Sequence, residues 1–179
     1  MGKTTEPALR HTIFQTRWGY FGLQGTVQGI IRTCLPLETA DAVLTRLISP
    51  QTSQRDNAYM KALQGQVIDY FKGKATRFSP NLTFIFTDLT PFQQDILHAC
   101  RGVSYGEKVS YVEVAGRAGH ARAARAAGTA LSKNPIPLII PCHRIITSSG
   151  EIGRFSSPGG TDTKRKLLVL EAANIQKKQ

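Results

Sequence analysis

The stretch Asn-Pro-Ile-Pro-Leu-Ile-Ile-Pro-Cys-His-Arg, residues 134–144, decides how the C-terminal half of this chain is built. Its prolines restrict the backbone and predict that no helix runs through it. The apolar run at 138–140 predicts a short extended segment that is buried in the core. A thiol, an imidazole and a guanidinium follow directly, in Cys142, His143 and Arg144. A rigid, buried segment that ends in these groups is suited to hold a nucleophile.

The cysteines also have a plainer interpretation. A lone cysteine in apolar surroundings is usually a small core residue, and a Cys-His pair alone is weak evidence of chemistry. Cys34, Cys100 and Cys142 are scattered, with no CxxC pair and no Cys/His cluster at zinc spacing. The sequence therefore predicts neither a disulfide framework nor a metal site, and it is typical of a reducing, intracellular compartment. Cys34 and Cys100 are interpreted as core residues.

The charge of the chain is unusual for a globular protein. Its 179 residues include 23 Lys and Arg against 12 Asp and Glu, which gives a formal net charge of +11. Such an excess favours a polyanionic partner, most simply nucleic acid, with an anionic membrane surface as the competing partner. The sequence shows neither a signal-peptide pattern nor a membrane-spanning segment. We therefore expect no membrane association and a location in the cytoplasm, or in the nucleus of a eukaryotic cell.

The first part of the chain has the pattern of mixed strands and helices. β-prone pieces separated by glycines lie between residues 11 and 35 and predict strands. Apolar residues at helical spacing predict helices over 39–48 and 57–71. Residues 82–86 are expected to form another strand. This part carries no chemical motif of its own, so we interpret it as a supporting domain.

A domain boundary is expected near Asp88. Thr90 followed by Pro91 is a strong signal for the start of a helix, and the chain beyond it is mainly helical in pattern. We therefore expect an α+β fold. In it, a small N-terminal α/β domain, residues 1–88, precedes an α-helical, winged helix-turn-helix-like domain, residues 89–179.

A helix-turn-helix pattern occupies the middle of the C-terminal domain. Ser110 can cap a short helix over 111–118, and after a Gly-His break a second helix is predicted over 121–132. The second helix carries Arg122 and Arg125 among small residues, which let a backbone approach a nucleic-acid groove while an arginine projects beyond it. An alanine-rich packing helix is the alternative, and the positive net charge favours DNA binding.

A loop and a final helix complete the pattern. Residues 153–160 are rich in Gly, Ser and Pro and predict a loop that can wrap a ligand. A last helix is expected to be capped by Thr161 or Thr163 and to carry Glu171 near its end. A carboxylate there is unfavourable with the helix dipole. Glu171 is therefore either an exposed charge or a partner for His143.

Together these motifs resemble those of the O6-alkylguanine-DNA alkyltransferase family, which repairs DNA by direct reversal. The matching motifs are Pro-Cys-His-Arg at 141–144, Asn-Pro-Ile-Pro at 134–137, Val-Ser-Tyr at 109–111, Ala-Ala-Arg-Ala at 123–126 and Lys-Leu-Leu-Val-Leu-Glu at 166–171. They occur in the family's order and at nearly its spacings across residues 90–173. Residues 11–88 resemble the family's N-terminal domain only in general layout.

The resemblance implies a single-turnover reaction. Cys142 would accept the O6-alkyl group of guanine, and also the O4-alkyl group of thymine, in an SN2 displacement after the base is flipped out of the duplex. His143 would deprotonate Cys142 through a water, and Glu171 would orient His143. Tyr111 would protonate the guanine O6, and Asn134 would brace the active-site turn. The thioether product cannot be reversed by the protein, so each molecule would act once.

The resemblance also implies how DNA and the base would be held. A monomer would bind double-stranded DNA containing O6-alkylguanine through the minor groove, with Arg125 in the gap left by the flipped base and Tyr111 against its 3′ phosphate. Further DNA-binding residues implied are Ala124, Ala126, Gly128 and Ser132. The residues implied to bind the alkylated base are Pro137, Ile145, Phe155 and Ser156. The resemblance implies no cofactor and no metal.

The chain departs from the family pattern in two places. The loop at 153–160 reads Gly-Arg-Phe-Ser-Ser-Pro-Gly-Gly, with extra residues before the final helix and Phe155 in a tyrosine-like position. This leaves open which alkyl groups the site accepts. The N-terminal zinc ligands of some vertebrate members are absent, since Cys34 and Cys100 lie elsewhere.

Three other functions fit the sequence less well than repair does. An alkyltransferase-like protein that only binds lesions would lack the cysteine that stands at position 142. A Cys-His hydrolase would need an oxyanion hole and repeated turnover, and it would leave the basic helix-turn-helix unexplained. A winged-helix transcription regulator would leave the proline-rich Cys-His segment without a role.

Overall fold

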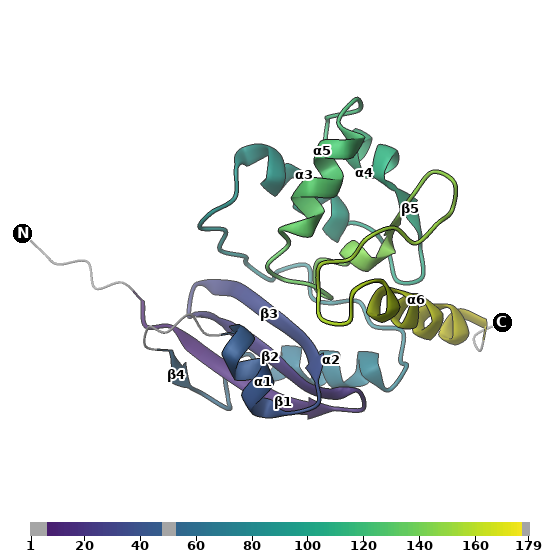
Figure 1. Ribbon diagram of the computed structural model, residues 1–179. Coiled ribbons are helices and arrows are strands. Elements are labelled where there is room, and N and C mark those ends of the chain that lie inside the picture. Colours follow the sequence, from purple (N-terminus) through teal and green to yellow (C-terminus); the bar gives the residue numbers. More distant parts are fainter. Residues whose placement is uncertain (1–6, 48–52, 177–179) are drawn as a thin grey trace, which may run out of the picture.

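The N-terminal half is built on a small sheet. The computed structural model describes residues 7–47 and 53–176. Three strands, β1 (Arg10–Thr16), β2 (Gly19–Thr26) and β3 (Gly29–Leu37), form an antiparallel meander. The short β4 (Gln54–Arg55) pairs with β1 in parallel, so the sheet order is β3-β2-β1-β4. The strands predicted between residues 11 and 35 are confirmed (Figure 1).

Helices pack on both faces of the sheet. α1 (Ala40–Leu47) places Val43 against one face, where Gly22 leaves room, because a Cβ at Gly22 would lie 2.6 Å from Val43. Gly22 lies inside β2, where its lack of a side chain lets α1 approach the sheet. α2 (Lys61–Phe71) packs its apolar side against the other face, with Val67 and Phe71 in the core. Residue 48, at the predicted end of the first helix, lies outside the described residues.

Two predictions for this half need correction. The second helix begins at Lys61 instead of residue 57, because Asp56 accepts a hydrogen bond from the backbone N–H of Ala58 and Met60 has a left-handed backbone (φ 52°). Residues 82–86 form no regular strand. They make only an isolated bridge between Ile30 and Phe84, because the backbone pairs with β3 at that one point.

The C-terminal half is mainly helical. α3 (Pro91–Arg101) and α4 (Tyr111–Arg117) each begin with a capping box, formed by Thr90 with Gln93 and by Ser110 with Glu113. After a turn, α5 (Ala124–Ser132) completes the predicted helix-turn-helix, although it begins at Ala124 and not at residue 121. The short strands β5 (Val109–Ser110) and β6 (Ile145–Ile146) pair in parallel beside it.

The last helix, α6 (Gly160–Gln176), begins earlier than predicted. Neither Thr161 nor Thr163 caps it, because both lie inside the helix. The backbone enters the helix through Gly159 and Gly160, which have positive φ angles of 77° and 52°. The Thr163 hydroxyl instead donates to the carbonyl of Pro158.

The predicted α+β fold class is confirmed, with a strand-containing N-terminal half and a helical C-terminal half (Figure 1). Buried side chains from both halves form one continuous cluster, in which Phe71 of α2 and Leu167 of α6 take part. The boundary near residue 88 stays a prediction. Across the described ranges, no helix has both the length and the apolar character needed to cross a bilayer.

Candidate active site

The segment 134–144 is a tight turn. Its apolar residues are buried, as predicted, but they are not extended, since Leu138 has a left-handed backbone with φ 77°. Asn134 stabilises the turn, because its Nδ2 donates to the carbonyl of Ile140 at 2.9 Å and its Oδ1 accepts from the N–H of Ile136 at 3.0 Å. The side chain of Asn134 thus supplies hydrogen bonds that an extended segment would obtain from a neighbouring strand.

A single 3-10 turn, η1 (Cys142–Arg144), follows. The prediction that no helix runs through the proline-rich segment is confirmed. Pro141 precedes this single turn, where a missing N–H breaks no helical hydrogen bond. The turn directs Cys142 and His143 to different surroundings. Cys142 is 7% exposed and lies 3.1 Å from Nδ2 of Asn134, whereas His143 is fully buried.

Glu171 is the centre of a buried hydrogen-bond network. One carboxylate oxygen lies 2.8 Å from Nε2 of His143 and 2.8 Å from the hydroxyl of Tyr70. Arg144 donates to both carboxylate oxygens, and the N–H of Gly106 donates to the second one at 2.9 Å. Burial alone would raise the pKa of Glu171, but the hydrogen bonds and charges of His143 and Arg144 lower it to about 2. Glu171 is therefore ionised, and its contact with His143 confirms the predicted pairing.

The ionised Glu171 determines which nitrogen of His143 carries a proton. A carboxylate only accepts hydrogen bonds, so Nε2 of His143 must donate to it. Burial lowers the pKa of His143 more than Glu171 raises it, which keeps the ring neutral near pH 7. Nδ1 then has a free lone pair, and it is buried with no hydrogen-bond partner among the described residues. A neutral imidazole oriented in this way is suited to act as a base.

The thiol of Cys142 is held in its neutral form. Burial raises its pKa, and the hydrogen bond from Asn134 and the charge of Lys164 oppose that effect. Lys164 is itself buried, donates to the carbonyl of Ile145 at 2.5 Å and has its pKa lowered to about 8 by burial. Cys142 therefore needs a base to become a thiolate at neutral pH.

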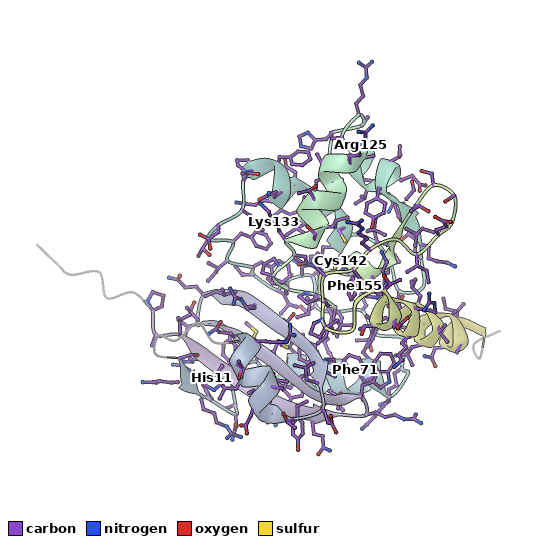
Figure 2. All side chains as sticks on the ribbon, in the orientation of Figure 1. His11, Phe71, Arg125, Lys133, Cys142 and Phe155 are labelled. Carbon is purple, nitrogen blue, oxygen red and sulfur yellow. The ribbon has the colours of Figure 1, made fainter. Side chains whose placement is uncertain are left out.

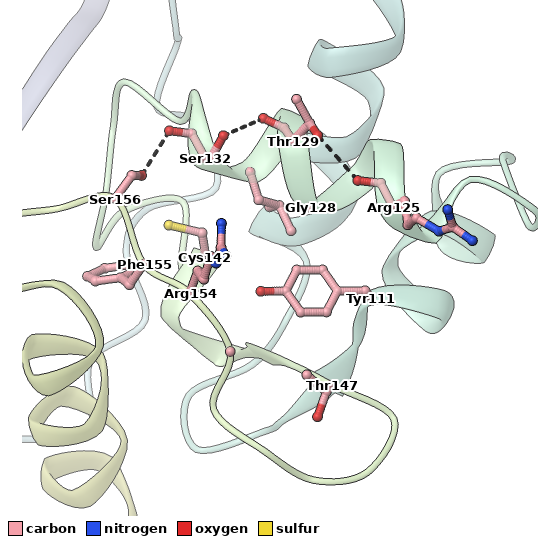
Figure 3. A pocket seen from close by; sticks show the side chains of 12 residues that line it. Tyr111, Arg125, Gly128, Thr129, Ser132, Cys142, Thr147, Arg154, Phe155 and Ser156 are labelled. Carbon is pink, nitrogen blue, oxygen red and sulfur yellow. Dashed lines mark hydrogen bonds between the residues drawn. The ribbon is translucent and has the colours of Figure 1, made fainter.

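Cys142 opens into a cavity of about 600 Å³ between α5 and the loop that follows β6 (Figure 3). Figure 3 shows the Tyr111 hydroxyl directed toward the side of the cavity that holds Cys142, while the Arg125 side chain points away from it. The Ser156 hydroxyl donates to the carbonyl of Ser132 at 2.8 Å, which ties the loop to the end of α5. The predicted site residues that line this cavity with Cys142 are Tyr111, Arg125, Gly128, Ser132, Phe155 and Ser156.

Other predicted residues lie outside the cavity. His143, Glu171 and Asn134 lie behind Cys142 and act on it through hydrogen bonds or charge. Pro137 lines a separate groove beside β3, and Ile145 is fully buried. Ala124 and Ala126 belong to α5, in the part of the molecule where Figure 2 labels Arg125. The functional roles of these residues stay predictions.

Three residues of the site were missed in the sequence. Tyr70 and Lys164 are buried beside the catalytic groups, and Arg154 lines the cavity next to Phe155. The spacing Lys164, Leu167, Glu171 places all three on one face of a helix, so it could have indicated Lys164. Tyr70 gave no signal, because a tyrosine in an apolar helical stretch has the pattern of a core residue. Within the described residues, no group of three His, Cys, Asp or Glu side chains could hold a metal ion.

Comparison with known proteins gives a consistent result. The family model described as the 6-O-methylguanine DNA methyltransferase DNA-binding domain matches residues 91–173. The methylated-DNA--protein-cysteine methyltransferase of Mycobacterium leprae is 40% identical over 120 residues, 67% of this chain and 69% of its own. That of Methanosarcina barkeri is 37% identical over 131 residues, 73% of this chain and 80% of its own. The match to the Mycobacterium bovis relative, at 43% identity, spans 61% of that relative's length.

A solved structure agrees over nearly the whole chain. Mycobacterium tuberculosis OGT in complex with DNA superposes with a TM-score of 0.76 at 31% sequence identity. The match covers 92% of this chain and 94% of that one. The similarity therefore includes the N-terminal half, for which sequence motifs gave only a general likeness.

Proposed function

Because the chain belongs to the 6-O-methylguanine DNA methyltransferase family, we propose that it repairs DNA by direct reversal and transfers an O6-alkyl group from guanine to Cys142. The observation that carries the proposal is the position of Cys142, which faces a cavity of about 600 Å³ and lies beside the buried His143–Glu171 pair. The names of the relatives support the same reaction.

The reaction is a displacement at the alkyl carbon. The sulfur of Cys142 forms a bond to that carbon, and the bond from the carbon to guanine O6 breaks. His143, whose Nδ1 is free to accept, takes the thiol proton through a water, and the Tyr111 hydroxyl gives a proton to the leaving guanine. After the transfer, the proton on His143 passes to solvent and the Tyr111 phenolate takes one back from solvent, so the net change is one proton moved from Cys142 to guanine, which leaves as a neutral base. Asn134 holds the turn and stabilises the developing thiolate, because its amide lies 3.1 Å from the sulfur.

Double-stranded DNA binds along α5 through the minor groove. Ala126 is exposed and Ala124 is half-buried at the start of this helix, and their small side chains let the backbone come close to the groove. Arg125 takes the place of the base that is flipped into the cavity. A Cβ at Gly128 would lie 3.6 Å from the Tyr111 ring, and both residues line the cavity between α5 and Cys142. The protein acts on DNA as a monomer.

The cavity holds the flipped base and its alkyl group. Phe155 and Ser156 contact the base, and backbone groups near Pro137 and Ile145 support the walls. O6-methylguanine is the principal substrate, and O4-alkylthymine, which carries the alkyl group on a similarly placed oxygen, is a second one. The thioether at Cys142 has no route back to a thiol, so each molecule reacts once. A reducing compartment, the cytoplasm or a eukaryotic nucleus, suits a protein that must keep this cysteine free.

Mass spectrometry tests the proposal directly. The protein is incubated with a duplex oligonucleotide that contains one O6-methylguanine, and intact and peptide masses are measured. We expect one methyl group per molecule on the peptide that contains Cys142, and none in Cys142→Ala. Cys34→Ala is the matched control, because Cys34 is also a buried free cysteine, and it should react like the wild type. Binding without any mass change would identify a lesion-binding protein, and release of product over many turnovers would identify a hydrolase.

A further inference from the structure

Tyr70 reaches the catalytic groups from the other half of the chain. It lies on α2, is fully buried, and is separated in sequence by 101 residues from Glu171. Its hydroxyl lies 2.8 Å from one oxygen of the Glu171 carboxylate and 3.4 Å from Nε2 of His143. The phenol thus contacts both members of the buried His143–Glu171 pair.

The direction of these hydrogen bonds is fixed by chemistry. Glu171 is ionised and can only accept, and Nε2 of His143 carries a proton that it donates to Glu171. The second neighbour of the Tyr70 oxygen, Nε2 of His143, is itself a donor, so the Tyr70 hydroxyl must donate its proton to Glu171. Burial and the charge of Glu171 raise the pKa of Tyr70 well above its ordinary value, so the phenol keeps its proton.

We propose that Tyr70 is a positioning residue for alkyl transfer, which fixes the Glu171 carboxylate and limits how strongly that carboxylate holds a second proton on His143. The inference rests on the proposed function, in which His143 is the base. The same carboxylate oxygen receives hydrogen bonds from Tyr70, His143 and Arg144. Each donor withdraws negative charge from the oxygen, so the imidazolium form of His143 is less stabilised and the neutral base persists at neutral pH.

The pair is also surrounded by titratable and charged groups that a substitution at Tyr70 does not alter. They belong to several elements: Lys164 on α6, Arg144 and Cys142 on η1, Cys100 on α3, and Tyr105 on the loop after α3. Tyr70→Phe removes one hydroxyl and keeps the ring. Without that donor the Glu171 carboxylate should stabilise the imidazolium more, so His143 should become protonated at higher pH.

The test measures the titration of His143 by NMR in the DNA-free protein, together with the pH dependence of the alkyl-transfer rate. In Tyr70→Phe we expect the His143 midpoint and the acid limb of the rate profile to move up together, by on the order of one pH unit. Tyr105→Phe is the matched control. The Tyr105 ring packs against Tyr70, but its hydroxyl is hydrogen-bonded to Asn174 and not to Glu171. The titration midpoint of His143 should therefore not move in Tyr105→Phe.

A substitution that preserves the packing provides a second measurement. Site-specific 3-fluorotyrosine at position 70 makes the phenol a stronger donor, so the His143 midpoint should move down. If Tyr70→Phe and Tyr105→Phe both lower the melting temperature and leave the His143 titration unchanged, Tyr70 is only a core residue and the proposal is wrong. Because the NMR titration needs no substrate, it tests Tyr70 even if the protein transfers no alkyl group.

Discussion

The side-chain amide of Asn134 lies 3.1 Å from the sulfur of Cys142 and 2.9 Å from the carbonyl of Ile140. One amide group therefore both closes the turn that holds the cysteine and donates toward the sulfur. Burial opposes formation of the thiolate, and this amide is the first of the groups that oppose burial. The shape of the turn and the reactivity of the thiol thus depend on the same side chain.

Asn134→Ala should make Cys142 less reactive. Loss of a hydrogen bond to a charged group costs about 1.5–3 kcal/mol, which corresponds to an increase of about 1–2 units in the pKa of the thiol. We expect alkylation of Cys142 by iodoacetamide, followed by peptide mass, to become about 10–100-fold slower at neutral pH. Asn174→Ala is the control, because the Asn174 amide likewise donates to a backbone carbonyl and to a second group, which is the Tyr105 hydroxyl and not the sulfur. An unchanged rate in Asn134→Ala would remove Asn134 from thiolate stabilisation.

The alkylated protein should be less stable than the free thiol form. Cys142 is 7% exposed, and an added methyl group competes for space with the turn that Asn134 closes. Overpacking of this kind costs about 1–3 kcal/mol, and each kcal/mol lowers the melting temperature by about 2–4 °C in a chain of this size. Calorimetry before and after reaction with a methylated oligonucleotide measures the change. A melting temperature that stays the same or rises would contradict the prediction.

Glu171→Gln should destabilise the fold strongly, because it leaves Arg144 buried without its anionic partner. Breaking one member of a buried pair typically costs about 3–5 kcal/mol. The pKa of Glu171 is lowered from 4.5 to about 2, so its contribution is fully present above pH 4.5 and is lost as the pH falls toward 2. Urea unfolding should therefore show a large difference between wild type and variant at pH 7 and a smaller one at pH 3. Glu107→Gln, at a half-exposed ion pair with Arg117, should cost less than about 1 kcal/mol.

Local patterns predict most helices and the strands between residues 11 and 35, but not the starts of α2 and α6 or the lack of a regular strand at 82–86. The caps at Thr90 and Ser110 follow from short-range rules, and these predictions are confirmed. The turn was predicted as extended because leucine rarely adopts the left-handed backbone that Leu138 has. The tertiary contacts that hold Leu138 in that conformation have no local signature.

The buried residues around Glu171 and Cys142 are not predicted from the sequence, for a similar reason. Tyr70 and Gly106 reach Glu171 from 101 and 65 residues away, and nothing near them marks a carboxylate partner. Lys164 resembles an ordinary charged residue at the start of a helix until its neighbours at 167 and 171 are seen to be buried. Tyr70 and Gly106 are recognised only when the packing of the two halves is known, whereas helical spacing could have indicated Lys164.

Arg125→Ala should reduce repair of duplex DNA far more than reaction with a free alkylated base. Arg125 is exposed on α5 and lines the mouth of the Cys142 cavity, so its role would be to replace the flipped base in the stack. Unstacking and unpairing a base costs a few kcal/mol, so losing its replacement should slow duplex repair by about 10–100-fold, while reaction with O6-benzylguanine stays within about twofold. Arg122→Ala is the matched control, since it removes the same charge from the exposed turn before α5 but not from the cavity. Equal losses on the duplex and on the free base would show that Arg125 acts on the cavity itself and not on base flipping.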